Sequence, residues 1–282
     1  PSIGFSLIFR RLPDGERKAI SMSPYDDFDK DWVPADYLNE YYKTQEVAPD
    51  EDAIYRFVFE TLKRSGRTYE RAIEFGCGPT IHHSLPLVSW CQQLHLADYL
   101  PSNLAEVARW LRADPDAHNW DVYVHGVLER EWESIEGPVS SEAIEIRKQL
   151  LRDRVTALKQ GDIRRSAPLE DNAQYDLVTS FYCADSITAS KEAWRQYIRN
   201  LSSLLAPGGL LILSALHQAK HYSAGRNRFP SANISASDME EVLSEEKFIP
   251  HSVKVRVEYF SGWEEEGFDG VCMASACAAN IG

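Results

Sequence analysis

The chain has 282 residues, of which 44% are hydrophobic and 26% are charged, so it is long enough to bury a sizeable core in one large domain. Its formal net charge of −13 disfavours coating a phosphate backbone, which needs clustered positive charge. The five cysteines are odd in number and lack C-x-x-C spacing, which disfavours a zinc site or a disulfide framework. No stretch approaches the roughly 18 apolar residues of a membrane span. We therefore expect a cytoplasmic monomer without a nucleic-acid, membrane or metal partner.

The amino-terminal part of the chain offers one apolar segment and one aromatic stripe. Ile3 to Phe9 is apolar but short, lacks a charged leader, and is expected to form a strand or a tether. Tyr37, Tyr41 and Tyr42 then recur at helical spacing after Pro34, a residue that suits the first turn of a helix. This pattern predicts a helical segment with one aromatic face.

A glycine turn follows the next helix. Residues 49–63 predict a helix whose acidic first turn favours the helix dipole. The apolar run Ala72 to Phe75 then predicts a short buried strand, and Gly76 and Gly78 allow a tight turn directly after it. Such a turn binds a nucleotide-like ligand at the edge of an open α/β sheet. Because Ile81 stands where a dinucleotide fingerprint has its third glycine, the turn favours a nucleoside over a pyrophosphate.

An acidic residue ends the second predicted strand. Residues 94–97 form this strand, and Asp98 lies 22 residues past Gly76 (98 − 76), where a carboxylate meets a ribose in such folds. Its two oxygens can accept from vicinal hydroxyls. Asn103, in the first turn of the next helix, can bond a ribose hydroxyl or the adenine edge. The pair predicts a nucleoside site beside the glycine turn.

Apolar periodicity places the remaining elements. Helices are predicted over 81–90, 101–112, 141–154 and 191–205, with another starting in a capped turn at Ser237–Glu240; strands are predicted over 155–158, 175–181, 210–213, 253–259 and 271–278. Residues 120–155 are interpreted as a decorated crossover and not as a second domain. His82 and His83 are adjacent on the first of these helices, where neighbouring side chains do not face each other, so a metal pair is not expected.

The motifs together resemble a known family. Residues 74–81 (Glu-Phe-Gly-Cys-Gly-Pro-Thr-Ile), Ala-Asp-Tyr at 97–99 and Tyr-Leu-x-x-Tyr-Tyr at 37–42 resemble the nicotinamide, phenylethanolamine and indolethylamine N-methyltransferases, over about 37–278. The resemblance implies an α/β, Rossmann-like class I methyltransferase with a central, mostly parallel seven-stranded sheet, flanking helices and an N-terminal helical lid. It also implies S-adenosylmethionine as cofactor. We expect one domain: lid and helices at 1–66, a cofactor-binding core at 67–215, and an acceptor-pocket segment at 216–282.

The resemblance also implies which residues hold the cofactor. Tyr37 and Tyr42 would reach its methionine end, Asp162 would accept from the adenine amine, and Ile163 would pack on the adenine ring. The full set of expected cofactor contacts is Tyr37, Tyr42, Gly76, Gly78, Pro79, Thr80, His82, Asp98, Tyr99, Asn103, Asp162, Ile163 and Phe181.

The acceptor site departs from the family pattern. The relatives carry an acid after the fifth strand, and an ungapped match places Ala215 there. Either the acid comes from elsewhere, or the nitrogen is less basic, or the acceptor is an electron-rich ring carbon whose proton passes to His217, His221 or Tyr222. The expected acceptor contacts are Tyr41, Asp185, Ala215, Ser231, Trp263 and Glu266.

We therefore expect a small-molecule methyltransferase that methylates an amine, guanidine or heteroaromatic nitrogen. C-methylation of an electron-rich ring such as an indole in secondary metabolism remains an alternative, as does a non-catalytic member of the family that binds the cofactor. A nicotinamide-dependent reductase is disfavoured by Ile81.

Overall fold

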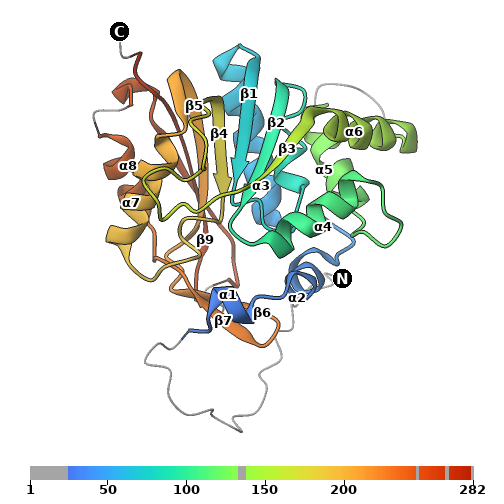
Figure 1. Cartoon of the computed structure of the whole chain (residues 1–282), viewed down its shortest axis with the longest axis horizontal. Helices are drawn as coiled ribbons and strands as arrows, with labels where there is room; N and C mark the ends of the chain where they lie inside the picture. The colour runs from blue at the N-terminus through green and yellow to red at the C-terminus, as the bar shows by residue number, and fades with distance from the viewer. Residues whose placement is uncertain (1–24, 133–137, 246–247, 264–266, 281–282) are drawn as a thin grey trace, which may run out of the picture.

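A seven-stranded sheet forms the centre of the molecule (Figure 1). The computed structural model describes residues 25–132, 138–245, 248–263 and 267–280. The sheet order is β3-β2-β1-β4-β5-β9-β8, in which β9 runs antiparallel to both its neighbours and the other pairs are parallel. The strands are β1 Tyr69–Phe75, β2 Cys91–Asp98, β3 Val155–Gln160, β4 Tyr175–Phe181, β5 Leu205–His217, β8 Lys254–Tyr259 and β9 Gly270–Cys277. The predicted Rossmann-like, mostly parallel sheet is confirmed.

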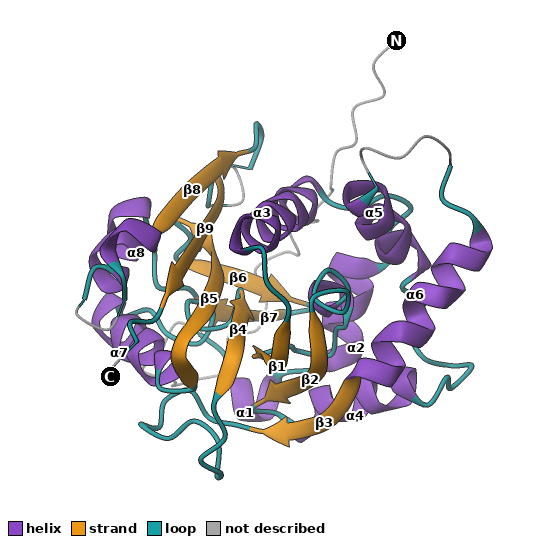
Figure 2. Cartoon of the chain, turned by 90° about the horizontal axis from the view of Figure 1, so that it is seen from above, coloured by secondary structure: helices purple, strands orange, loops and turns teal. Residues whose placement is uncertain are grey.

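Alternation along the strands builds a core on each face of the sheet. Neighbouring residues such as Ala72 and Ile73 point to opposite faces and belong to different hydrophobic clusters. The helices α3 (Pro49–Ser65), α4 (Pro101–Leu111), α5 (Asp121–Glu131) and α6 (Ser141–Arg154) pack with the first cluster, and α7 (Lys191–Ser202) and α8 (Ala236–Leu243) with the second. Figure 2 shows α7 and α8 on the opposite side from α5 and α6. None of the helices within the described ranges is long and apolar enough to cross a membrane.

The strand order places a crevice at the carboxyl edge of the sheet. The chain moves from β1 outward to β2 and β3, then returns to the other side of β1 with β4 and β5. The connections therefore diverge between β1 and β4, where an open α/β sheet binds its ligand. Gly76 directly follows β1 at this point, and Tyr182 directly follows β4.

Two small units cover this edge, at the bottom of Figure 1. The first comprises α1 (Phe28–Asp31), α2 (Pro34–Tyr37) and the π-helical turn η1 (Leu38–Tyr42); the second is the hairpin of β6 (His221–Ala224) and β7 (Asn227–Pro230). They are joined by the Tyr41 hydroxyl, which donates to Ser223 O at 2.6 Å, and by the Gly225 amide, which donates to Glu40 Oε2 at 2.5 Å. The helical segment predicted after Pro34 is confirmed.

Three predicted boundaries are wrong. Residues 81–90 form no α-helix but a 3₁₀ turn, η2 (His82–Ser84), followed by tight turns, because Pro86 has no N–H to donate. Helix α7 ends at Ser202 and β5 begins at Leu205, so the Pro-Gly-Gly segment belongs to the strand. Helix α8 is capped by Ser235, whose hydroxyl accepts from the Asp238 amide, and not from within Ser237–Glu240.

Four elements besides η3 (Pro250–Ser252) were not predicted: α1, α5, β6 and β7. Helix α5 has buried residues at helical spacing, Tyr123, Val124, Val127 and Leu128, which could have revealed it. The β6–β7 hairpin turns through Gly225-Arg226, with Gly225 at φ 61°, a turn that favours glycine. Helix α1 has only four residues, too few to show helical periodicity in the sequence. The expected strand or tether at Ile3–Phe9 lies outside the described residues.

Candidate active site

A cavity of about 1110 Å³ opens at the carboxyl edge of the sheet. This volume exceeds that of most small-molecule pockets, so it can hold a nucleoside cofactor and a small acceptor together. The sequence-predicted site residues in its wall are Tyr37, Tyr41, Tyr42, Gly76, Gly78, Thr80, Asp98, Tyr99, Asn103, Asp162, Ile163, Phe181, Tyr222 and Trp263. They come from segments between residues 37 and 263, so the fold gathers groups distant in sequence around one space.

The glycine turn forms a cradle with room for a ligand. Gly76 has φ 77° and Gly78 has φ 62°, a region that side chains other than glycine rarely adopt. A Cβ on Gly76 would also overlap the Cys183 side chain, whereas a Cβ on Gly78 would meet no atom within 4 Å. The turn at Gly78 therefore borders open space in the cavity, as the predicted cofactor requires. Pro79, buried behind the turn, does not line the cavity.

Asp98 ties the turn to the next helix. Its Oδ2 accepts from the Gly78 amide at 2.9 Å, and its Oδ1 accepts from the Leu100 amide and from Asn103 Nδ2, both at 2.9 Å. Burial raises the pKa of Asp98, although these bonds oppose that effect. A carboxylate has about four lone-pair sites, so Asp98 retains capacity for a further donor in the cavity.

A second polar group lies past β3. The Arg164 guanidinium donates to both oxygens of Asp162, at 2.8 and 3.0 Å, and lies over the Tyr99 ring at 4.4 Å. Asn200 Nδ2 donates to Ile163 O at 2.9 Å and fixes that residue at the wall. Tyr99 and Ile163 both line the cavity beside this ion pair.

The N-terminal segment supplies an aromatic cover. Trp32 Nε1 donates to Asn103 Oδ1 at 2.8 Å, which links this segment to the first turn of α4. The hydroxyls of Tyr37 and Tyr42 lie 3.3 Å apart, and that of Tyr42 donates to Glu51 Oε1 at 3.4 Å. Both tyrosines line the cavity beside the first turn of α3.

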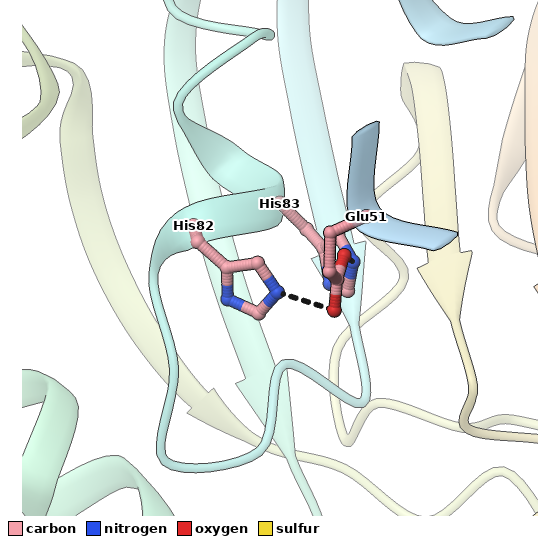
Figure 3. Close-up of side chains that lie close together, drawn as sticks. All are labelled: Glu51, His82 and His83. Carbon is pink, nitrogen blue, oxygen red and sulfur yellow. Dashed lines mark hydrogen bonds and ion pairs between the residues drawn. The ribbon is translucent and has the colours of Figure 1, made fainter. Parts of the chain in front are cut away.

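The two adjacent histidines converge on one carboxylate. His82 Nε2 lies 3.0 Å from Glu51 Oε1, and His83 Nε2 lies 2.6 Å from Glu51 Oε2 (Figure 3). The expectation that these histidines diverge is wrong, because η2 is a 3₁₀ turn and not part of an α-helix. His83 lines the cavity, whereas His82 stacks on Trp120 behind it.

Burial and mutual charge shift the ionisation of this cluster. Burial raises the pKa of Glu51, but His83 and His82 outweigh that effect and hold it below its usual range. Burial and the neighbouring His83 lower the pKa of His82 to about 4. Burial also disfavours charged His83, but Glu51 raises its pKa overall. The favoured state is therefore a Glu51–His83 ion pair beside a neutral His82.

The sequence did not predict that the acidic first turn of α3 forms part of the cavity wall. Asp50 and Glu51 were interpreted only as a favourable first turn, yet both line the cavity. Burial and the neighbouring Glu51 raise the pKa of Asp50 to about 7. Its Oδ2 accepts from the Tyr182 hydroxyl at 2.8 Å, and Tyr182 has the uncommon φ of 50° for a tyrosine. The acidic run alone carried no signal that two of its members face inward.

Several predicted acceptor or catalytic residues do not line the cavity. Ala215 is buried within β5 opposite Cys272. His217 Nδ1 lies 2.5 Å from Asp269 Oδ1, and His221 Nδ1 accepts from Arg228 at 2.9 Å. Other partners thus hold both histidines outside the cavity. Ser231 is buried without reaching the wall, and Glu266 lies outside the described residues.

Asp185 lies directly behind the wall. It is fully buried, its Oδ2 accepts from the Leu216 amide at 3.2 Å, and its Oδ1 has no hydrogen-bond partner within the described residues. Burial raises its pKa to about 7. Its sequence neighbours Cys183 and Ser186 line the cavity, as does Leu216. Asp185 is thus an incompletely bonded buried acid next to the cavity wall.

The comparisons with known proteins agree with this geometry. The model of the NNMT/PNMT/TEMT family matches residues 21–277. The chain belongs to this family. It is 27% identical over 227 residues to mouse indolethylamine N-methyltransferase, covering 78% of the chain and 83% of that protein. It is 28% identical over 218 residues to human nicotinamide N-methyltransferase, covering 75% of the chain and 80% of that protein.

Solved structures show the same fold at low identity. The N-methyltransferase NodS from Bradyrhizobium japonicum, in complex with S-adenosylhomocysteine, has a TM-score of 0.50 and 13% identity, covering 86% of this chain and 98% of that one. An S-adenosylmethionine-dependent methyltransferase from Clostridium acetobutylicum has a TM-score of 0.51 and 11% identity, covering 87% and 97%. The protein is therefore an S-adenosylmethionine-dependent N-methyltransferase with the class I fold.

Proposed function

We propose that this enzyme methylates a small nitrogen compound, an amine, a guanidine or a heteroaromatic nitrogen, within the cavity at the carboxyl edge of the sheet. The relatives it matches are named for nicotinamide, indolethylamine and phenylethanolamine. Tyr37, Tyr41 and Tyr222 supply aromatic wall on the acceptor side, which suits a flat or partly aromatic compound. The net charge of −13 agrees with a small acceptor and not a nucleic acid.

Cofactor positioning follows from the contacts around the glycine turn. We propose that Asp98 and Asn103 hold the ribose, that Tyr99 and Ile163 border the adenine, and that Tyr37 and Tyr42 meet the methionine end. The cofactor supplies an activated methyl on a sulfonium. The protein aligns the acceptor nitrogen in line with it and excludes water under the N-terminal segment.

The observation that carries the acceptor assignment is the state of Asp185. A buried carboxyl with a pKa of about 7 and an unbonded oxygen is suited to hold an amine or guanidine N–H and to take up its proton. This acid would replace the one that the family pattern has at Ala215. Asp185 itself does not line the cavity, but Cys183, Ser186 and Leu216 around it do, so we place the acceptor nitrogen at this part of the wall.

An acceptor panel tests the proposal. The purified enzyme is incubated with S-adenosylmethionine and each of several amines, guanidines, pyridines and indoles, and mass spectrometry detects products one methylene heavier. We expect turnover of a nitrogen compound, and we expect Asp185→Asn to lower kcat/KM for it by about 10-fold or more, the cost of about one charged hydrogen bond. The control Asp153→Asn removes an exposed carboxylate on α6.

Two outcomes would contradict the proposal. A methyl group found on a ring carbon would assign the enzyme to C-methylation. Equal kcat/KM for Asp185→Asn and the wild type would remove Asp185 from the acceptor site.

A further inference from the structure

We propose that Glu51, His82 and His83 form a binding site for one divalent transition-metal ion in the wall of the cavity (Figure 3). Glu51 comes from the first turn of α3, and the histidines come from η2, directly after the glycine turn. One ligand atom from each side chain lies within 4.8 Å of the other two. The cofactor and acceptor assignments above do not need this ion, so it can be tested on its own.

The spacing of the ligand atoms suits a small ion. Zinc bonds to imidazole nitrogen and carboxylate oxygen at about 2.0–2.2 Å, which separates the ligand atoms of a tetrahedral site by about 3.3 Å. The two contacts of Glu51 are 3.0 and 2.6 Å. An ion would lengthen these two contacts by less than an ångström, and the ligand nitrogens of the two histidines lie within 4.8 Å of each other.

The donor set determines the class of metal. Two imidazole nitrogens and one carboxylate oxygen favour Zn²⁺, Co²⁺ or Fe²⁺, whereas Mg²⁺ and Ca²⁺ favour sites made of oxygen. Three protein ligands leave at least one position open, as in catalytic and not structural zinc sites. Glu51 and His83 line the cavity, so an ion bound between them would lie at the cavity wall. The open position would take water or a nitrogen or oxygen atom of a bound small molecule.

The surroundings favour a cation and orient the ligands. Side-chain exposure is 0% for His82 and 5% for both His83 and Glu51, so bulk water competes little for the ion. Two more carboxyl groups are close in the fold: Asp50 adjoins Glu51, and Glu74 accepts from the hydroxyl of Ser84, which follows His83. A buried excess of carboxyl groups is neutralised by a bound metal ion.

Other contacts hold two of the ligands in orientation. The Tyr42 hydroxyl donates to Glu51 Oε1, the kind of outer contact that tunes a ligating carboxylate. The His82 ring stacks on Trp120 with 5.1 Å between centroids and 9° between planes, and its Nδ1 has no hydrogen-bond partner within the described ranges. Stacking therefore orients the His82 ring in place of a second hydrogen bond.

Metal uptake by the full chain tests the proposal. The protein is stripped with a chelator, equilibrated with Zn²⁺, desalted and analysed by inductively coupled plasma mass spectrometry. We expect one Zn²⁺ per chain, and with Co²⁺ a visible spectrum typical of a four- or five-coordinate nitrogen and oxygen site. In calorimetric titration with Zn²⁺, we expect Glu51→Gln, His82→Gln and His83→Gln each to weaken binding by about 100-fold or more, beyond what loss of an outer contact causes.

The control is His125→Gln, which removes a half-exposed histidine paired with Glu129 on α5 and should bind Zn²⁺ as the wild type does. Circular dichroism checks that each variant is folded. A wild-type chain that retains no Zn²⁺ or Co²⁺ would overturn the proposal whatever the variants do, and would leave the cluster as an ion pair with a neutral histidine. Folded Glu51→Gln and His83→Gln variants with unchanged affinity would place the ion elsewhere, for example on the cysteines, and would overturn it as well.

Discussion

At the scale of single residues, the carboxylates of the site differ in how completely their oxygens are bonded. Asp98 accepts three hydrogen bonds that connect the glycine turn to α4, whereas Asp185 has one oxygen without a partner within the described residues. A carboxylate that accepts on both oxygens is held in place and can still accept from a ligand, whereas a buried one with an unbonded oxygen is suited to take up a proton. The two residues therefore lead to different predictions.

Replacing Asp98 should weaken cofactor binding more than it weakens the fold. Asp98→Asn keeps the size of the side chain but loses its charge, and each charge-assisted hydrogen bond contributes about 1.5–3 kcal/mol. We expect the Kd for S-adenosylhomocysteine, measured by calorimetry, to rise about 10- to 100-fold, with Asp153→Asn as the unaffected control. A folded Asp98→Asn variant with wild-type affinity would remove Asp98 from the cofactor site.

Asp185 should make stability depend on pH. Its pKa is about 7 in the folded protein against an ordinary value of 3.8, so between these values the folded state keeps a proton that the unfolded state has released. The stability contributed by the neutral form is complete below about pH 4 and is lost as the pH rises toward 7. Asp185→Asn should therefore leave Tm nearly unchanged at about pH 4 and raise it at about pH 8, as measured by calorimetric scans. An equal shift of Tm at both pH values would mean that Asp185 does not titrate in this range.

At the scale of elements, the N-terminal segment is connected to the body by hydrogen bonds at its rim. Trp32 bonds to Asn103 on α4, Tyr41 bonds to Ser223 on β6, and Glu40 accepts from Gly225 in the hairpin turn. Aromatic rings of this segment, such as those of Tyr37 and Tyr42, also line the cavity. Because a ligand would complete the packing of these rings, the segment has the features of a lid.

Cofactor binding should therefore order this lid. Hydrogen exchange across residues 34–46 should slow when S-adenosylhomocysteine is added, because release of the segment would then also expose the ligand. Trp32→Phe removes the bond to Asn103 and should speed exchange in the same residues without ligand. The exposed helix α6 serves as the internal reference. Equal exchange of residues 34–46 with and without ligand would make the aromatic stripe ordinary core.

Local sequence patterns predicted most helices and strands, but they did not predict contacts between elements that are distant in the sequence. The strands at 72–75, 94–97 and 175–181 follow from short apolar runs, and the glycine turn follows from a backbone requirement local to the chain. Glu51 meets His82 and His83 only because the first turn of α3 packs beside η2. The two histidines lie 31 and 32 residues after Glu51 in the sequence. No local pattern encodes such a contact. The helix wrongly predicted over 81–90 also implied that the side chains of the two histidines point in different directions.

At the scale of the whole molecule, the difference between local patterns and distant contacts also explains why the acceptor residues were harder to predict than the cofactor residues. Most of the residues proposed for the cofactor follow β1, β2 and β3, where parallel strands bring their carboxyl ends together, so motif and topology together predicted their place at the cavity. The residues proposed for the acceptor come mainly from segments after β4 and β5, whose side chains divide between the cavity and the protein interior. His217 and Ser231 belong to the interior, and Tyr222 belongs to the cavity. Sequence spacing in irregular segments does not distinguish these two directions.

Binding at a crevice between the two halves of the sheet should stabilise the entire fold. A ligand that binds only the folded state at 100 times its Kd adds about 2.7 kcal/mol to the free energy of unfolding. For a chain of this size, that corresponds to a rise in Tm of about 5–10 °C. We expect S-adenosylmethionine and S-adenosylhomocysteine to give this shift in a thermal unfolding assay, and NAD to give none, because the turn after β1 has Ile81 where a pyrophosphate-binding turn has glycine. A shift with NAD as large as that with S-adenosylhomocysteine would mean that the crevice recognises only the adenosine shared by these molecules, and that Tyr37 and Tyr42 do not select the methionine end.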